Sequence, residues 1–497
     1  MTDAVFSPQK SISILDRLLA WRRAWLEIDR NREAIRYVQT LQGQIVLHAA
    51  VFTLIGLCVT RWTVCVLASV ALTLIAISPR HRLHVLLLGT IGFLAIAPLR
   101  NESFKTVPGT IMDRFGLQGM SAEVINIATA FAFVIVSLVL LALQARFRGT
   151  APARRPLISL MVIFWSLIGI AVSGLLPPWP QVVLWSFIAI FSSCFWSLVY
   201  ASADLKAGDP TPNHLRIGLF RPMWGAPLMP IGKGTGYLSK FEAKDDDALA
   251  SLRLRALKLF VWALMLFWFE KAVRYTVYDV AGLPTLAEAI TAQSTGGAPA
   301  MAAGWGVVLT HYFLKVIVLC NTGHLVVAII RMAGYGIPRN STKPLAARSI
   351  AEFWNRYFFY FKELLIDFFF YPAFLRWFKS NKALRLAFAT FFAAGVGNFL
   401  HHFMRRIDFL AYDGFMGALW NYSHYAIYCT VLSAGLIISQ LRNRRPQPED
   451  GFLRYEVLPR VNVALFFCLV AILDDTPVPV TYAERLSFFL SLFGVKV

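Results

Sequence analysis

The chain contains a series of apolar runs, each about as long as a bilayer is thick. A hydrocarbon core of about 30 Å needs about 20 mainly apolar residues in one helix. Backbone groups inside lipid must be hydrogen-bonded within the segment, so each run is expected to be helical. The predicted spans are 44–60, 62–78, 83–99, 121–145, 157–176, 181–201, 256–278, 304–332, 384–404, 414–439 and 459–474. The first two spans could also form one interrupted hairpin.

The composition agrees with a membrane-embedded bundle. Of the 497 residues, 57% are hydrophobic and 15% are charged, whereas soluble domains carry about 25% charged residues. These values exclude a disordered or fibrous chain and argue against an ordinary cytosolic enzyme. We therefore expect an all-α polytopic membrane protein with about 11 transmembrane helices, plus re-entrant or interfacial helices.

The formal net charge of +20 is unevenly distributed along the chain. Basic residues cluster before the first span, in 202–255, in 333–383 and after residue 439, whereas the 279–303 connection has none. By the positive-inside rule the N-terminus is cytoplasmic, and an odd number of spans places the C-terminus outside. The basic segment 405–414 is an exception on the outer side. The excess charge is mainly a topology signal, so we do not expect nucleic-acid binding.

These patterns divide the chain into five regions. The sequence WRRAWLEIDRNREAIR in the polar leader predicts an amphipathic helix on the membrane surface, with a solvated helix as an equal alternative. The leader is too long and too mixed to be a cleavable signal peptide. The regions are the cytoplasmic leader 1–43, the N-terminal transmembrane helices 44–201, the cytoplasmic loop 202–255, the core 256–440 and the C-terminal helices 441–497.

The six cysteines do not indicate a metal site. All of them lie within apolar spans and none forms a CxxC pair. A buried free cysteine behaves as a small hydrophobic residue. We expect no bound metal and no bound cofactor.

The densest set of polar residues within apolar sequence begins at GYGIPRNSTKPLAARSIAEFWNRY and continues to residue 424. It is too charged for a simple span and too aromatic for a free loop, so we expect a re-entrant or interfacial pair of helices. Glu363 and Asp367 are four residues apart and therefore share a helix face. They are expected to pair with nearby Lys or Arg, and a catalytic carboxylate pair is the alternative.

Two adjacent histidines end a later apolar run, LRLAFATFFAAGVGNFLHHFMRR. Neighbouring positions on a helix point about 100° apart, so His401 and His402 cannot easily share one metal. One is expected to face the bundle interior and the other a neighbouring helix or the interface. A functional histidine and a merely hydrogen-bonded one remain equal alternatives here.

Further polar residues lie in other spans. His311 and His324 are thirteen residues apart on one helix and face different sides, and Lys315 lies between them. Structural pairing with Glu270 and Lys271 on the preceding span is expected rather than catalysis. The segment Tyr422, Ser423 and His424 follows the outer connection and is a weaker candidate for binding an acceptor.

The run from Gly336 resembles the signature of the membrane-bound O-acyltransferase (MBOAT) family, in which a P-x-N segment precedes R-S-I-x-E-F-W-R-R-W. The matching positions are Gly336, Pro338, Asn340, Pro344, Arg348, Ser349, Ile350, Glu352, Phe353, Trp354 and Arg356. Downstream, Asp367 and Pro372 fit the family's R-D-[YF]-x-[YF]-x-P element, and GNFLHHF places His401 at its near-invariant histidine. LFRPMWGAPLMP at 219–230 is a weaker match. The sequence departs from the pattern at Phe358, where the family usually has His or Asn.

The resemblance implies a bundle around a central tunnel, and acyl transfer from coenzyme A or a carrier-protein phosphopantetheine to a hydroxyl. His401 would be the general base, and Asn355 could supply the polar function missing at Phe358. Candidates for binding substrates are Lys343, Arg348, Arg356, Trp354, His402 and Asp367. The same basic residues could instead set topology or contact lipid headgroups.

The resemblance also implies a location and partners. Bacterial members commonly acylate cell-surface polymers, so we expect a protein of the bacterial inner membrane that transfers an acetyl group to a surface glycan or polymer. Membrane lipids and a periplasmic protein are further expected partners. Acylation of a lipid or small metabolite is one alternative, and a transporter or flippase is another. Against the latter, no repeated half-motifs are found.

Overall fold

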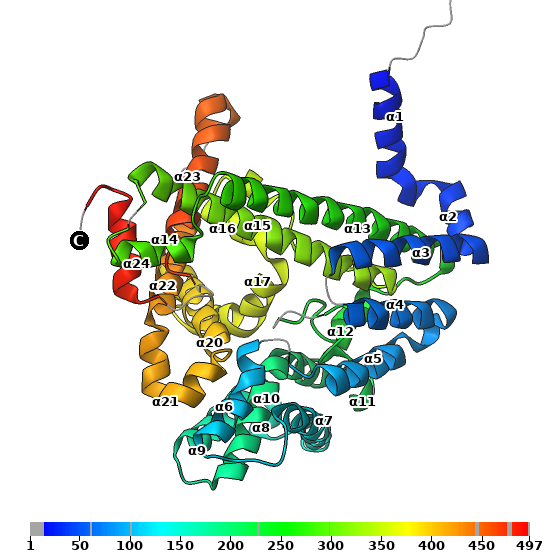
Figure 1. Ribbon diagram of the computed structural model, residues 1–497. Coiled ribbons are helices and arrows are strands. Elements are labelled where there is room, and N and C mark those ends of the chain that lie inside the picture. Colours follow the sequence, from blue (N-terminus) through cyan, green and yellow to red (C-terminus); the bar gives the residue numbers. More distant parts are fainter. Residues whose placement is uncertain are drawn as a thin grey trace, which may run out of the picture.

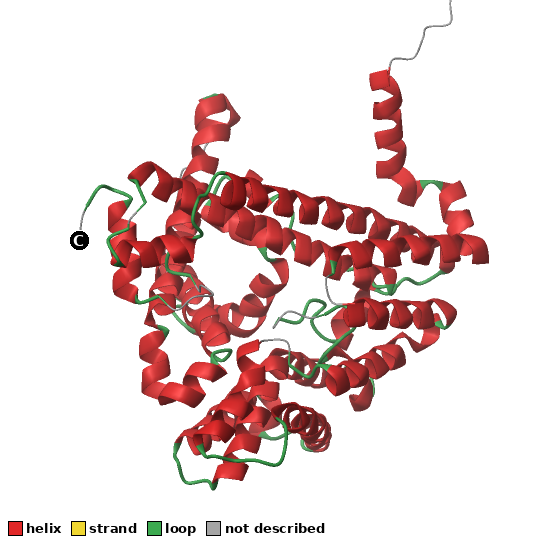
Figure 2. Cartoon of the chain, viewed as in Figure 1, coloured by secondary structure: helices red, strands yellow, loops and turns green. Residues whose placement is uncertain are grey.

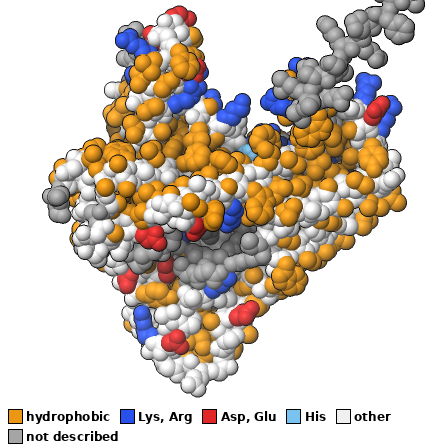
Figure 3. Space-filling view, turned by 45° about the horizontal axis from the view of Figure 1, so that its top comes forward, with side chains coloured by type: hydrophobic (Ala, Val, Ile, Leu, Met, Phe, Trp, Pro, Cys, Tyr) orange, Lys and Arg blue, Asp and Glu red, His pale blue; other side chains and the backbone are white. Residues whose placement is uncertain are grey.

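The computed structural model describes residues 14–59, 62–99, 102–225, 229–297, 299–442, 447–474 and 480–495. Within these ranges the chain is helical and contains no strand (Figure 2), apart from one isolated bridge between Glu242 and Tyr335. The prediction of an all-α protein is therefore confirmed. Hydrophobic side chains cover much of the face in Figure 3, as expected for a surface in contact with lipid.

Six helices in the described part are long and apolar enough to cross a membrane. They are Leu41–Cys58, Ala122–Arg146, Pro178–Lys206, Met301–Met332, Lys382–Phe403 and Ile407–Leu441. Two shorter apolar helices, Trp62–Ile77 and Pro156–Val172, also match predicted spans. The other predicted spans lie in a more charged helix, Asp246–Arg274, and in the short helices Arg82–Ile96 and Leu458–Ala471.

In the first part of the chain, α10 is the central helix, against which other helices pack. α10 is the most buried of the six long helices, and α6, α7 and α9 pack against it (Figure 1). The elements are α1 (Ile14–Glu27), η1 (Ile28–Arg30), α2 (Arg32–Gln39), α3 (Leu41–Cys58), α4 (Trp62–Ile77), η2 (Pro79–His81), α5 (Arg82–Ile96), α6 (Glu102–Arg114), α7 (Ala122–Arg146), α8 (Ala151–Arg154), α9 (Pro156–Val172) and α10 (Pro178–Lys206).

The polar leader is not one continuous helix. The Asp29 carboxylate is buried in η1, where it pairs with Lys258 and, at 2.9 Å, with Arg255. Burial alone would raise the pKa of Asp29, but the hydrogen bonds and charges of these two bases hold it below its usual value. This anchor turns the chain between α2, which packs on α3 and α13, and α1, which projects away from the body (Figure 1). Residues 1–13 of the leader lie outside the described residues.

The middle of the chain contains the longest helix pair. α13 and α15 lie side by side along most of their lengths (Figure 1). The region predicted as a cytoplasmic loop, 202–255, holds several short helices. The elements are α11 (Asn213–Arg216), η3 (Ile217–Leu219), α12 (Thr235–Leu238), η4 (Ser239–Phe241), α13 (Asp246–Arg274), the π-helix η5 (Tyr275–Val280), α14 (Leu286–Ser294) and α15 (Met301–Met332).

The last part of the chain contains the segment predicted to be re-entrant or interfacial and most of the π-helical turns. The elements are η6 (Pro344–Ala346), α16 (Ile350–Tyr357), α17 (Phe359–Leu365), η7 (Ile366–Phe370), α18 (Tyr371–Arg376), α19 (Lys382–Thr390), η8 (Phe391–Gly397), α20 (Asn398–Phe403), α21 (Ile407–Asn421), α22 (Ser423–Leu441), η9 (Pro448–Asp450), η10 (Leu453–Val457), α23 (Leu458–Ala471) and α24 (Tyr482–Ser491). Of these, η7, η8 and η10 are π-helices, which occur frequently at functional sites.

The predicted span 414–439 is not one continuous helix, because the helix breaks at Gly414 and again at Tyr422. Gly414 has φ +68°, a left-handed conformation that glycine adopts without steric cost, and it breaks α21. The chain breaks again at Tyr422 before α22 begins at Ser423. The basic segment 405–414, predicted as a connection, is mostly part of α21.

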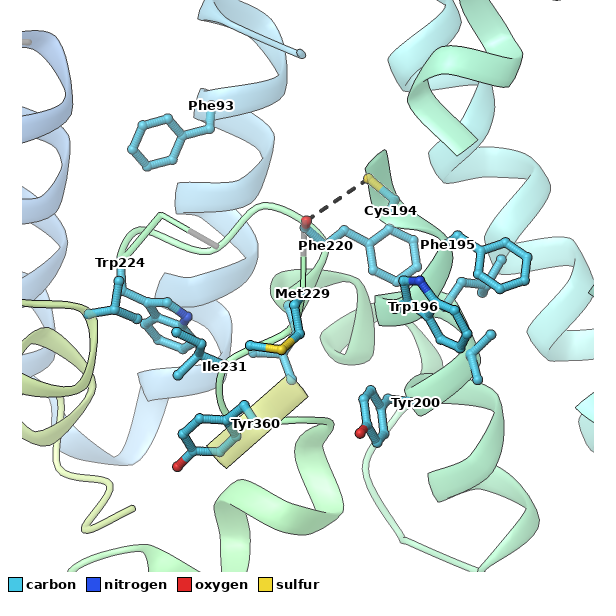
Figure 4. Packing of buried hydrophobic residues seen from close by; sticks show 14 of the residues in the cluster. Phe93, Cys194, Phe195, Trp196, Tyr200, Phe220, Trp224, Met229, Ile231 and Tyr360 are labelled. Carbon is cyan, nitrogen blue, oxygen red and sulfur yellow. Dashed lines mark hydrogen bonds between the residues drawn. The ribbon is translucent and has the colours of Figure 1, made fainter. Parts of the chain in front are cut away.

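A large hydrophobic core connects α10 with the 219–231 segment and with α17. Figure 4 shows Met229 between Trp224 on one side and Trp196 on the other. Cys194 also contacts this segment, since its thiol donates to the carbonyl oxygen of Phe220 at 3.9 Å. The weak match at 219–230 to the family signature thus lies against the helix that carries Trp196, within the limits of the described residues.

Candidate functional site

His401 is buried among aromatic rings where α20, α10 and α17 meet. Only 2% of the residue is exposed. Its ring stacks on Trp196 at a centroid distance of 5.6 Å and lies 4.8 Å from the ring of Phe361. Its Nδ1 is buried and has no hydrogen-bond partner among the described residues. A buried nitrogen without a partner is uncommon in native structures and needs an explanation, such as a ligand or a catalytic role.

The position of His401 depends on a close approach of two helical segments. A Cβ atom added at Gly397, one turn before His401, would lie 2.7 Å from the ring of Phe369 in η7. Only glycine therefore allows the end of η8 to pack this closely on η7. This contact brings α20 close to α17, where Phe361 lies.

His402 points to a different neighbour, as the helix geometry predicts. Its ring lies 4.7 Å from that of Tyr425 on α22 and 5.7 Å from that of Phe361. His401 faces Trp196 instead, so the two histidines have different partners apart from Phe361. In the described part of the chain no cluster of His, Cys, Asp or Glu could hold a metal ion.

The Asn340 segment of the signature folds back onto α16 and α17. Asn340 is 1% exposed, and its carbonyl oxygen accepts a hydrogen bond from the Phe359 amide at 2.9 Å. The Ser341 hydroxyl donates to the Tyr357 carbonyl oxygen at 2.6 Å. Tyr360 in turn donates its hydroxyl to the Pro338 carbonyl oxygen at 3.0 Å. These bonds fix the start of α17 and hence the position of Phe361, two residues after Phe359.

Two of the three basic residues predicted to bind a donor are held in ion pairs. Arg348 pairs with Glu456 and its guanidinium lies 4.0 Å from the ring centroid of Tyr455. Arg356 pairs with Glu352 at 2.5 Å, one turn earlier on α16. Lys343 is exposed and makes no ion pair within the described residues. Lys343 is therefore the basic residue of this group most available to an anionic ligand.

Glu363 and Asp367 form an ion-paired cluster with Lys233. The Lys233 ammonium donates to Asp367 at 2.8 Å and to Glu363 at 3.1 Å, and Lys362 also contacts Glu363 at 3.1 Å. The prediction that the two carboxylates pair with basic residues is confirmed. Burial alone would raise the pKa of Glu363, but hydrogen bonds and charge from Lys233 and Lys362 lower it. Burial alone would lower the pKa of Lys233, but the two carboxylates raise it.

Replacement of Lys233 by methionine is expected to lower the free energy of unfolding by about 1–3 kcal/mol, because two partly buried carboxylates lose their shared donor. The loss should be largest at neutral pH. It should shrink in acid, as the pH falls through the lowered pKa of Glu363, and in alkali, as the pH rises through the raised pKa of Lys233. Unfolding in mixed micelles measures the difference. Lys240→Met, an exposed lysine in the neighbouring η4, is the matched control. A loss independent of pH would contradict the electrostatic explanation.

Asn355 and Trp354 line a cavity of about 170 Å³ that does not include His401. Asn355 is exposed on α16, so the structure does not bring the two predicted catalytic residues into contact. The ring of Trp354 lies 6.2 Å from that of Phe361, which separates this cavity from His401. Its wall also includes Lys362, Thr390 and Gln440.

A second cavity, of about 620 Å³, shares no lining residue with the first. Phe358, which stands at the departure from the family pattern, lines this cavity, and its ring lies 5.6 Å from that of Phe361. Phe361 thus contacts a wall residue of each cavity and both histidines. The sequence analysis did not identify Trp196 or Lys233, and it did not identify the second cavity.

The pairing expected between the two long helices is wrong. Glu270 pairs with Arg274 on its own helix, and Lys315 pairs with Asp474 from the segment after α23. His311 and Lys315 line the second cavity instead, together with Val318 and Thr322. These four residues, 311, 315, 318 and 322, are separated by four, three and four positions. This spacing places them on one face of a helix and could have indicated from the sequence that they line one surface.

No protein-family model matches this chain, and none of the curated protein sequences matches it.

Proposed function

We propose that this protein is a membrane-embedded acyltransferase that moves an acyl group, an acetyl group in the leading hypothesis, from a thioester donor to a hydroxyl. The observation that carries the proposal is His401, which is buried between Trp196 and Phe361 with an unpartnered Nδ1. It lies at the end of an apolar helix, and buried polar groups in such positions are functional candidates by default. The resemblance of the 336–356 segment to the MBOAT signature gives the class of reaction.

The proposed reaction needs one base. A hydroxyl is a weak nucleophile at neutral pH and is activated by a base within hydrogen-bond reach. His401 accepts the hydroxyl proton while the oxygen attacks the thioester carbonyl. A C–O bond forms and the C–S bond breaks, and the proton leaves with the thiol. No residue of the protein becomes acylated.

Two separate cavities, each with a wall residue in contact with Phe361, support separate binding sites for the donor and the acceptor. The basic connections lie on the side that the charge pattern assigns to the cytoplasm, where an anionic donor is made. We propose that the donor enters from that side, near Trp354, and that Lys343 contacts its phosphates. The acceptor reaches His401 from the opposite side. This arrangement assumes about 11 spans around a central tunnel in the bacterial inner membrane, with the N-terminus cytoplasmic.

An assay on purified protein in nanodiscs tests the reaction class. Radiolabelled acetyl-CoA is supplied with a panel of hydroxylated acceptors, and both free thiol and labelled acceptor are measured. An acyltransferase produces one thiol for each acylated acceptor. A transporter would release no thiol in nanodiscs and, after reconstitution into sealed vesicles, would move the labelled compound inside; that result would overturn the proposal.

A further inference from the structure

The second cavity is enclosed by segments far apart in the sequence. It lies between the end of α13 with η5, the start of α14, one face of α15 and the junction of α16 with α17. Its volume of about 620 Å³ is within the range of small-molecule sites, about 300–1,000 Å³. The wall residues used below are Arg274, His311, Lys315, Thr322, Asn340 and Phe358.

The cavity extends along α15 from the 279–303 connection towards the middle of the molecule. Its wall on α15 runs from His311 to Gly323, twelve residues further on, which is about 18 Å of helix. The end near the connection contains Tyr278 and Thr285. The charge pattern places this connection outside, so the cavity leads inward from the face opposite the basic connections.

The cavity wall is rich in hydrogen-bond donors and basic groups. Arg274, Lys315 and His311 lie on it, and no described residue of its wall is an acid. The carboxylates that pair with the two cations, those of Glu270 and Asp474, are not part of the wall. A space lined by one sign of charge attracts ligands of the opposite sign.

An unsatisfied donor lies deeper in the cavity. Asn340 is 1% exposed and lines the cavity, and its Nδ2 has no hydrogen-bond partner among the described residues. Gly323 on α15 allows this close approach, since a Cβ atom there would lie 2.8 Å from Asn340 Nδ2. A buried amide donor without a partner is costly unless a ligand or an ordered water accepts from it.

The inner end of the cavity is separated from His401 by two aromatic rings. Phe358 lines the cavity, its ring lies 5.6 Å from that of Phe361, and the Phe361 ring lies 4.8 Å from that of His401. Phe358 therefore occupies a position between the cavity and the base.

We propose that this cavity binds a hydroxylated acceptor that carries a carboxylate or phosphate. Lys315 and Arg274 attract the anionic group, His311 can donate a hydrogen bond to it, and Asn340 donates to an oxygen near the reacting hydroxyl. The apolar half of the wall, which includes Leu314, Val318 and Leu319, packs against the carbon skeleton. The assignment of this ligand as the acceptor rests on the acyltransferase proposed above, whereas its binding does not.

Binding of two matched disaccharides to the purified protein in nanodiscs tests this site without any acyl donor. Digalacturonate and α-1,4-galactobiose have the same linkage and differ in that only the first carries carboxylates. We expect digalacturonate to bind at least tenfold more tightly at low salt, with a preference that falls as the salt concentration rises. Equal affinities, or tighter binding of the neutral sugar, would overturn the anionic assignment.

One variant and its control locate the binding. Thr322→Phe places a ring inside the cavity and is expected to weaken digalacturonate binding at least tenfold. Leu309→Phe adds a ring to the same helix at a position that is 46% exposed and outside the cavity wall, and binding should be unchanged. Equal binding by Thr322→Phe and the unmodified protein would show that the sugar binds elsewhere.

Coenzyme A is also anionic, so a competition arm separates donor from acceptor. We expect coenzyme A not to displace digalacturonate, and competitive displacement would overturn the assignment of the cavity to the acceptor. Failure of the whole reaction has a different signature. If the cavity binds digalacturonate but no acceptor is acylated and His401→Gln has no effect on any activity, the acyltransferase is wrong and the anion site stands.

Discussion

Replacement of His401 by glutamine is expected to reduce acyl transfer by about 10²–10⁴-fold, the usual contribution of a general base. Glutamine fills a similar volume between Trp196 and Phe361 and keeps hydrogen-bonding groups, but it cannot take a proton at neutral pH. Alanine would remove the base and also leave a space between the two rings. Comparison of the two variants separates lost chemistry from lost packing.

The measurement is the initial rate of thiol release and acceptor labelling, normalised to monodisperse protein. His84→Gln is the matched control, because His84 is exposed on α5, away from the aromatic rings around His401. It should retain full activity. A rate near that of the unmodified protein for His401→Gln would refute the assignment, and a selective loss for His402→Gln would move the base by one residue.

The helical fold and the direction of the two histidines follow from local sequence patterns. Apolar runs predict helices because backbone groups in lipid must be bonded within the segment. The turn of about 100° per residue predicts that His401 and His402 face different neighbours, and Trp196 and Tyr425 are those neighbours. The shared face of Glu363 and Asp367 predicts a common partner, but it does not say which basic residue this is.

The partners themselves depend on contacts between distant segments. Lys233 lies 130 residues before Glu363, and Lys258 lies 229 residues after Asp29. Such pairs are not encoded in periodicity, and the wrong pairing expected for Lys315 shows the consequence. The contacts of Phe361 with both histidines also depend on segments that are distant in the sequence. In addition, a run of aromatic residues in an apolar region is equally typical of core packing.

The departure at Phe358 has a physical interpretation in the structure. A polar side chain at this position would lie on the cavity wall, whereas phenylalanine extends the apolar partition between the cavity and His401. Asn340 supplies a buried donor in the same cavity. Asn340 and Phe358 thus line the same cavity, whereas Asn355 lines the other one.

The loop that carries Lys233 is anchored by a buried cluster at its base. Arg216 is 1% exposed and its guanidinium contacts the Asp209 carboxylate at 2.9 Å and the Asp209 carbonyl oxygen at 2.7 Å. Thr235, two residues after Lys233, donates to the same carboxylate at 2.9 Å. The Gly236 amide donates to Asp204 at 2.9 Å, which ties the segment to the end of α10. Arg216 thus joins the base of the loop to the helix that carries Trp196.

Replacement of Arg216 by methionine is expected to lower the free energy of unfolding by about 3–5 kcal/mol, because it leaves the Asp209 carboxylate buried without its counter-charge. The loop should then lose its fixed position, and the contact of Lys233 with Glu363 and Asp367 with it. Unfolding in mixed micelles measures the loss. Arg80→Met changes an exposed arginine and should stay within about 0.5 kcal/mol of the unmodified protein.

A second substitution distinguishes loss of a charge pair from loss of packing. In Arg216→Met combined with Asp209→Asn, the unpaired charge is removed while the amide oxygen can still accept from Thr235. If the buried charge causes the instability, the double variant should be more stable than Arg216→Met alone, so that the two changes are strongly non-additive. Additive losses would mean that Arg216 acts mainly by filling space, and the loop would then be held by the Asp204 contact instead.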